Sequence, residues 1–346
     1  MSHHHKHHGH RERSNCNGEY YERFKVNNIV SNLPNAAKNQ DPYLVDAWNI
    51  VIVNKDDMWV CNKVTSLLTN YDLSGNILST PVQIPNVGAD PALPTGLIIN
   101  DSTGFVITKG TNVASSYLII ATENGTICGY NPLVDSSNAI TVVDNSITNA
   151  CYKGIAMVNN YLCATDFYNR KVDVFDFNFV LTASLPFVDL EVLNPIPSNY
   201  GPYGIVNIDD FIYVTYAEQK GPDNTEDQPG KGHGYISIFN KDGLFVKRFA
   251  SRCKLNSPYG IIKTPDTFGG LSNQLLIGNH GNGKLYVYNC EGEVVSVLKD
   301  KCKNKIVIHG LHGLTKCDDD THYVYWASGS TSCLTGLIGN IRKDKH

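Results

Sequence analysis

A short pattern recurs six times along the chain: one variable residue, then Gly, then a branched aliphatic residue. The copies are Trp48-Asn49-Ile50, Thr95-Gly96-Leu97, Lys153-Gly154-Ile155, Tyr203-Gly204-Ile205, Tyr259-Gly260-Ile261 and His312-Gly313-Leu314, with Asn in the place of Gly in the first. Five intervals separate Asn49 from Gly313, so the period is about 53 residues. A period of this size with several short apolar runs is typical of propeller blades. The sequence therefore predicts an all-β fold, a six-bladed β-propeller.

The composition supports short strands and tight turns in place of helices. The chain contains 19 Tyr, 29 Gly and 15 Pro among 346 residues, and these residue types favour strands and the turns between them. A hydrophobic content of 42% is enough for a packed core, and closed all-β folds of this length are often single domains. We therefore expect one propeller domain over residues 19–346, preceded by a polar tail over residues 1–18.

Charge and hydropathy exclude several classes of partner. The formal net charge is -4, and no basic patch interleaved with aromatic residues is present, so we expect no nucleic-acid partner. No apolar stretch approaches the roughly 20 residues needed to span a bilayer, and the polar N-terminus does not resemble a signal peptide. The sequence therefore predicts no membrane span and a cytoplasmic or virion-associated protein.

Each interval of the repeat divides into short strand-like runs separated by turn signals. In the second interval the expected strands cover residues 96–100, 105–109, 117–121 and 126–130. Glu123-Asn124-Gly125 then forms a hairpin turn, because Asn and Gly supply the positive φ that such turns require. On this interpretation Glu123 is a turn residue and not a catalytic acid.

The two ends of the chain are expected to complete one blade together. The last interval provides strands over residues 313–316, 323–327 and 337–341 but no outer strand, whereas Phe24–Val30 is a spare strand at the N-terminal end. Pairing the two removes both exposed sheet edges. We therefore predict that the N-terminal strand closes the ring.

Several longer segments resemble an uncharacterised propeller family, known mostly from bacteria and also carried by large DNA viruses, in which PEP-CTERM sorting tails are common. The matching segments are residues 41–50 (DPYLVDAWNI), 121–132 (ATENGTICGYNP), 152–154 (YKG), 172–176 (VDVFD), 213–217 (YVTYA), 255–260 (LNSPYG) and 278–283 (GNHGNG). The chain departs from the family pattern at Asn49, Asn124, Tyr130, His280 and Asn282. The resemblance covers roughly residues 24–340. It implies a six-bladed propeller close to NHL-repeat and gluconolactonase-like proteins, and it implies no activity.

Propeller geometry places the start of each inner strand and the end of each second strand around one mouth of the tunnel. The resulting candidates for binding at this mouth are Asn62, Lys109, Lys153, Asp166, Glu218, Asn279, His280 and His312. Amide, carboxylate and imidazole groups can bind a hard cation such as calcium, or a sugar. The alternative is that the Asn and Asp residues cap strand ends and bind water in the channel.

Two functional hypotheses follow. In the favoured one the propeller is a non-enzymatic binding or structural scaffold, whose protein or small-molecule partner meets the mouth or the rim. In the alternative it is a metal-dependent hydrolase of lactonase type, with Asn62, Asp166, Glu218 and Asn279 as oxygen ligands. Lys109 and Lys153 count against a cation at the mouth. The polar loop over residues 218–232 is either a lid over the mouth or a solvated surface insertion.

The tail contains six of the twelve histidines, at His3, His4, His5, His7, His8 and His10. Imidazole groups bind copper, nickel and zinc. A free N-terminal amine, two amide nitrogens and a third-position imidazole would form a square-planar site that suits Cu(II) or Ni(II). An expression tag or an incidental polar tail are the alternatives to a metal-binding role.

Overall fold

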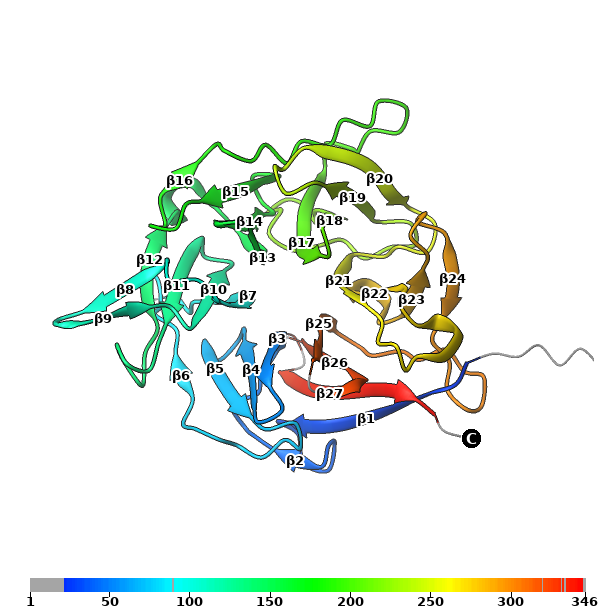
Figure 1. Cartoon of the computed structure of the whole chain (residues 1–346), viewed down its shortest axis with the longest axis horizontal. Helices are drawn as coiled ribbons and strands as arrows, with labels where there is room; N and C mark the ends of the chain where they lie inside the picture. The colour runs from blue at the N-terminus through cyan, green and yellow to red at the C-terminus, as the bar shows by residue number, and fades with distance from the viewer. Residues whose placement is uncertain (1–21, 89, 319, 331, 333, 345–346) are drawn as a thin grey trace, which may run out of the picture.

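The structure, a computed structural model, describes residues 22–88, 90–318, 320–330, 332 and 334–344. Six sheets surround a central axis, and the strands of each sheet follow one another from the axis to the rim (Figure 1). The only helical segments in the described ranges are three 3-10 turns: η1 (Ser146–Thr148), η2 (Gly269–Leu271) and η3 (His280–Asn282). The predicted all-β, six-bladed propeller is confirmed.

The blades follow one another along the chain. From axis to rim, the first blade contains β3 (Ala47–Asn54), β4 (Asp57–Asn62), β5 (Leu67–Tyr71) and β6 (Val82–Gln83), and the second contains β7 (Pro94–Ile99), β10 (Leu118–Thr122), β11 (Thr126–Tyr130) and β12 (Ile140–Asp144). The third contains β13 (Tyr152–Val158), β14 (Tyr161–Asp166), β15 (Lys171–Phe175) and β16 (Leu181–Thr182), and the fourth contains β17 (Tyr200–Ile208), β18 (Phe211–Glu218), β19 (Tyr235–Phe239) and β20 (Phe245–Ser251). The fifth contains β21 (Pro258–Lys263), β22 (Leu275–Asn279), β23 (Leu285–Tyr288) and β24 (Val294–Val297).

The sixth blade joins the two ends of the chain. Its strands are β25 (Leu311–Cys317), β26 (Asp320–Ser330), β27 (Thr335–Lys343) and β1 (Phe24–Ser31), with the short β2 (Asn39–Gln40) beyond β1. Strand β1 pairs antiparallel with β27, from Phe24 opposite Lys343 to Ser31 opposite Leu337. In Figure 1 the N-terminal strand, in blue, therefore lies beside the C-terminal strand, in red.

The second blade differs from the sequence-based prediction. Residues 105–109 were expected to form its second strand, but β8 (Val106–Lys109) pairs only with β9 (Asn112–Ser115), in a separate ribbon. The ribbon turns at Gly110, which has a φ of 61°, a conformation typical of tight hairpins. Strand β10 therefore pairs directly with β7, and β12 is the outer strand. The prediction was wrong because the ribbon is an insertion that has the pattern of a blade strand.

Every inner strand bulges at the repeated motif. The register between the inner and second strands shifts at Trp48, Thr95, Lys153-Gly154, Tyr203-Gly204, Tyr259-Gly260 and His312-Gly313. A bulge leaves an extra residue unpaired and changes the direction of its side chain. The first residue of each motif is thereby free to contact its counterparts from other blades.

The motif glycines lie where neighbouring inner strands approach each other. A Cβ atom on Gly204 would lie 2.4 Å from the carbonyl oxygen of Tyr259, and one on Gly260 would lie 2.7 Å from that of His312. These distances are shorter than van der Waals contact, and the obstructing atoms belong to backbone. The glycines are therefore required by the close packing of the six blades.

Replacement of Gly204 by Val is expected to lower the free energy of unfolding by about 1–3 kcal/mol through overpacking. Gly270→Val is the matched control, because its Cβ would meet no atom closer than 3.5 Å. Chemical denaturation of both variants measures the difference. Equal stability of the two variants would mean that Gly204 is not at a crowded position.

Candidate binding site at the tunnel mouth

The first residues of the six motifs close the tunnel. The Tyr259 hydroxyl reaches from the fifth blade to the carbonyl oxygens of Lys153, at 2.8 Å, and Thr95, at 3.2 Å. The Tyr259 ring also contacts the edges of Trp48, Tyr203 and His312. Since Tyr259 joins the fifth blade to the second and third across the axis, the tunnel is not an open pore.

This closure leaves two cavities along the axis. The one on the mouth side has a volume of about 870 Å³ and is lined by side chains that include Trp48, Lys63, Glu226, Asp227, His280 and His312. The one at the opposite end measures about 160 Å³ and is lined by Gly154, Gly204, Gly260, Gly313 and neighbouring aliphatic residues. Polar and charged side chains therefore gather at the mouth, and the opposite end offers mainly backbone and aliphatic groups.

Three stacked rings form one wall of the mouth cavity. The His312 ring lies 3.8 Å from Trp48 and 4.2 Å from His280, centroid to centroid, with 20° between the planes in both pairs. Burial lowers the pKa of His312 well below its usual value, and His280, Lys63 and Lys153 lower it further. His312 is therefore a neutral imidazole at neutral pH.

Two lysines and two glutamates form a network of ion pairs beside these rings. Oε1 of Glu123 lies 2.5 Å from Nζ of Lys153 and 2.9 Å from Nζ of Lys63. The Glu226 carboxylate also contacts both lysines, with Oε1 3.0 Å from Lys63 and Oε2 3.7 Å from Lys153. The network contains two positive and two negative groups, so its charges balance.

The surroundings of the network favour the ionised forms of Lys63, Lys153 and Glu226. Burial alone would lower the pKa of Lys63 and of Lys153, but Glu123 and Glu226 raise both above the usual lysine value. Burial would likewise raise the pKa of Glu226, but Lys153 and Lys63 lower it to about 2. The lysine side chains are 5% and 0% exposed, whereas that of Glu226 is 49% exposed. Glu226 is therefore the member of the network that faces solvent.

The segment between β18 and β19, residues 219–234, lies across the mouth. Besides Glu226, it contributes Asp227, whose Oδ1 accepts a hydrogen bond from the Tyr203 hydroxyl at 3.0 Å, and Gln219, which donates to the carbonyl of Phe167 at 2.6 Å. A further hollow of about 500 Å³, lined in part by Glu123, Cys151 and Thr225, lies beside the same segment. The segment thus borders two hollows, in the position of a lid.

Acidification is expected to release this segment. The pKa of Glu226 is about 2 in the folded protein and 4.5 when unperturbed, so its ion pairs stabilise the closed segment fully above pH 4.5 and are lost as the pH falls toward 2. Amide hydrogen exchange of residues 220–232 measures this release, with Glu226→Gln compared at each pH as the control. We expect the variant to exchange faster above pH 4.5 and the difference to vanish near pH 2. A difference that does not change with pH would contradict the expectation.

Three of the sequence-predicted candidates meet at the mouth: Lys153, His280 and His312. Asn62, Asp166 and Asn279 are buried and bind their own blades. Asn62 donates to Thr69 Oγ1 and to nearby carbonyls, Asp166 accepts from Asn169 and the Cys151 amide, and Asn279 joins Lys254 to Asn256. These contacts fit the alternative interpretation, in which such residues fix strand ends.

Two further candidates lie elsewhere. Glu218 accepts hydrogen bonds from Asn199 and Tyr200 and lies 2.8 Å from His233 Nδ1, and the mouth side chains of its segment are Glu226 and Asp227 instead. The placement of Lys109 at the mouth was wrong: it belongs to the β8–β9 ribbon, where it is exposed and pairs with Asp135. The cause is the insertion of the ribbon before the true second strand, β10.

Sequence reasoning missed Lys63, Glu123, Glu226 and Asp227. Lys63 and Glu123 occupy the same structural position as His280, one residue beyond the end of a second strand. Applying that offset to every blade would have selected both. Glu226 and Asp227 come from a segment that is not part of the repeat. Glu226 contacts Lys63, which lies 163 residues away in the sequence.

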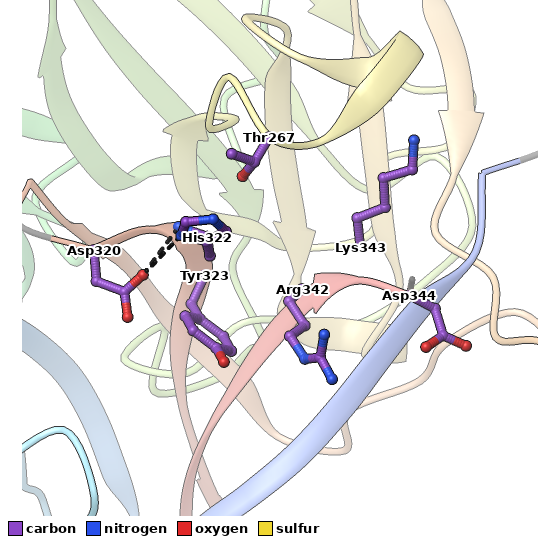
Figure 2. Close-up of a pocket in the computed structure, with 7 residues that line it drawn as sticks. All are labelled: Thr267, Asp320, His322, Tyr323, Arg342, Lys343 and Asp344. Atoms are coloured by element: carbon purple, nitrogen blue, oxygen red, sulfur yellow. Dashed lines mark hydrogen bonds and ion pairs between the residues drawn. The ribbon is translucent and has the colours of Figure 1, made fainter. Parts of the chain in front are cut away.

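Another hollow, of about 570 Å³, lies at the rim of the sixth blade (Figure 2). Its lining side chains include His322, Tyr323, Arg342 and Asp344, and Asp320 lies 3.3 Å from His322. Lys343 pairs with Glu22 at 2.8 Å. This hollow receives no side chain from the repeated motif and is lined by the sixth blade and by Thr267 of the fifth, so the mouth is the stronger candidate.

The metal candidates of the tail, His3 to His10, lie outside the described residues, and copper or nickel binding there stays a prediction. Within the described ranges, no group of three or more His, Cys, Asp or Glu residues is placed to hold a metal ion. The same ranges contain no helix long and apolar enough to cross a membrane.

Sequence comparison finds related proteins from a virus. The chain is 39% identical over 327 residues to uncharacterized protein L690 of Acanthamoeba polyphaga mimivirus, covering 93% of this chain and 86% of the relative. It is 36% identical over 324 residues to uncharacterized protein R648 of the same virus, covering 93% and 81%. No family model matches the chain. The link to bacterial proteins with PEP-CTERM tails stays a prediction.

Structure comparison finds the same fold in distant proteins. A Bacteroides thetaiotaomicron protein of unknown function has a TM-score of 0.58 at 13% identity, covering 93% of this chain and 77% of its own. A streptogramin B lyase has a TM-score of 0.53 at 12% identity, covering 93% and 98%. At these identities the likeness concerns the fold alone.

Proposed function

We propose that this chain, which belongs to the family of mimivirus proteins L690 and R648, is a binding scaffold whose tunnel mouth takes a small polar ligand without converting it. The observation that carries the proposal is the mouth cavity of about 870 Å³, whose lining includes Trp48, Lys63 and His312. Ligand sites are typically concave, of about 300–1,000 Å³, with a few polar groups among apolar walls. The stacked rings and the buried ion pairs supply both kinds of surface.

The hydrolase alternative has less support from the geometry. Of its proposed oxygen ligands, Asn62, Asp166 and Asn279 are engaged within their own blades, and Glu218 binds His233 and Tyr200. The ammonium groups of Lys63 and Lys153 at the mouth would oppose a nearby cation such as calcium. A tunnel metal site would therefore have to form against this charge.

Ligand-observed NMR tests the binding role. The probes are glucose, glycine, benzoate and benzylamine, each measured with the wild-type protein and with His309→Trp, in which a large ring is added at an exposed residue lining the mouth cavity. We expect at least one probe to bind the wild type, to lose binding in the variant and to keep its own spectrum unchanged on long incubation. Binding that the variant does not affect would contradict the proposed site, and conversion of a probe would favour an enzyme.

The viral relatives also bear on location. Because L690 and R648 are mimivirus proteins, we propose that this chain acts in virus particles or in the cytoplasm of an infected host cell. Immunodetection in purified particles of a virus that encodes it distinguishes the two. A signal that is removed when intact particles are treated with protease would indicate the particle surface.

A further inference from the structure

We propose that the mouth binds the carboxylate of a small organic acid between Lys63 and Lys153, and that Glu226 occupies this position in the structure as an internal competitor. This inference rests on the proposed binding function and names the chemical class of the ligand. It follows from how the four charged groups of the mouth are held.

The two lysines belong to the rigid part of the propeller. Lys153 lies on β13, and Lys63 directly follows β4; their ammonium groups lie 5.2 Å and 4.7 Å from the centroid of the Trp48 ring. Glu123, which directly follows β10, binds both lysines and is itself 6% exposed. The blades alone therefore build a site with two positive groups and one negative group.

The fourth group comes from outside the blades. Glu226 lies on the segment that crosses the mouth, and its half-exposed carboxylate offers one oxygen to each lysine. If the segment moved away, two buried ammonium groups would share Glu123 alone, and a buried charge without a partner is costly. The carboxylate of a ligand would restore the charge balance, because it can offer one oxygen to each lysine as Glu226 does.

The charge also selects a carboxylate over a phosphate. Lys63, Lys153 and Glu123 together carry a net charge of +1, which a monoanion neutralises, and the carboxylates of Asp46 and Asp227 add negative charge to the lining of the cavity. A dianionic phosphate would leave an excess negative charge close to Asp227, whose carboxylate lines the same cavity. The rest of the acid has room in the mouth cavity beside Trp48, His280 and His312.

The segment is held over the lysines by the Glu226 ion pairs and by hydrogen bonds on either side of them, among them those of Gln219 to the Phe167 carbonyl and of the Gly230 amide to Asn256. Asp227 accepts the Tyr203 hydroxyl, and the Cys151 thiol makes a long contact of 3.7 Å with the carbonyl of Thr225. Hollows of about 870 and 500 Å³ lie beside this stretch. Lys63 lines the larger hollow, so a ligand can approach it from the cavity, and a shift of the segment would open the way to the buried Lys153.

Isothermal titration with benzoate tests the proposal on the full chain. Glu226→Gln keeps the size of the side chain and removes its charge, so benzoate should bind this variant at least about ten-fold more tightly than the wild type, since affinity is reduced by the fraction of sites that the competitor leaves open. Glu293→Gln is the matched control, because Glu293 is an exposed residue in the turn before β24. This control should bind benzoate as the wild type does.

Two matched probes test the charge preference. Benzylamine has nearly the shape of benzoate but the opposite charge, and inorganic phosphate tests the other oxyanion. Neither should gain affinity in Glu226→Gln. A gain for benzylamine, or a larger gain for phosphate than for benzoate, would overturn the assignment of the ligand class.

The contribution of Lys63 to benzoate binding is tested in the Glu226→Gln variant. Lys63→Met combined with Glu226→Gln should lose the gained affinity, with folding checked by a thermal melt. If that protein does not fold, suppression of benzoate binding to Glu226→Gln by chloride serves instead, and insensitivity to salt would overturn the ion pair. If benzoate binds the wild type and Glu226→Gln with equal affinity, and His309→Trp still blocks binding to both, Glu226 is not a competitor but the mouth remains a binding site. Absence of any probe at the mouth overturns both.

Discussion

A chain that lacks residues 1–31 is expected to lose its cooperative folded state. Strand β1 contributes Phe24, Ile29 and Val30 to the core, and burial of three such side chains stabilises the fold by about 5–9 kcal/mol. That is comparable to the roughly 5–15 kcal/mol by which a typical domain is stable. The deletion also exposes the edge of β27 to pairing with other chains.

Circular dichroism and thermal melts measure this loss, and a chain without residues 1–18, which keeps all of β1, is the control. We expect the control to melt as the full chain does, and the longer deletion to give no cooperative transition or to aggregate. A cooperative melt of the longer deletion within a few degrees of the control would contradict the structural role of β1.

Replacement of Glu123 by Gln is expected to lower the free energy of unfolding by about 3–5 kcal/mol, the usual cost of removing one partner from a buried ion pair. Lys63 and Lys153 would then share Glu226 alone, although their side chains are only 5% and 0% exposed. Chemical denaturation measures the effect, with the exposed Glu293→Gln as the control.

A second variant distinguishes charge from packing at the same position. The double variant Glu123→Gln/Lys153→Met restores equal numbers of positive and negative groups, so it should regain more than half of the lost stability, because a buried ion pair can often be replaced by apolar groups at little cost. A double variant less stable than Glu123→Gln would show that Lys153 is stabilised by contacts other than the ion pairs.

The repeated motif is the part of the sequence that predicts the fold. Each copy of the motif combines a glycine that packing requires, such as Gly204 or Gly260, with an apolar inner strand, and this combination is enough to predict six blades. It also predicts which residues face the mouth, because a bulge directs Lys153 and His312 toward the axis. Local pattern and global architecture agree at these positions.

The site itself was less accessible to sequence reasoning. Lys109 was misplaced because β8 has the alternating apolar pattern of a blade strand. Tertiary contacts, which the local pattern does not contain, decide that the β8–β9 ribbon pairs apart from the blade. Glu123 was assigned to a turn, which is its backbone position, but its side chain turns inward to the lysines. Glu226 lies in a segment without periodicity, so its pairing with Lys63 depends on the path of the loop across the mouth.

A crystal structure of Glu226→Gln grown with benzoate would show where the mouth holds a carboxylate. We expect the carboxylate within about 3 Å of both the Lys63 and the Lys153 ammonium groups, with the ring in the cavity beside Trp48 and His280. Benzoate found only in the rim hollow near Arg342, or a mouth without benzoate at a concentration that saturates binding in solution, would contradict this expectation.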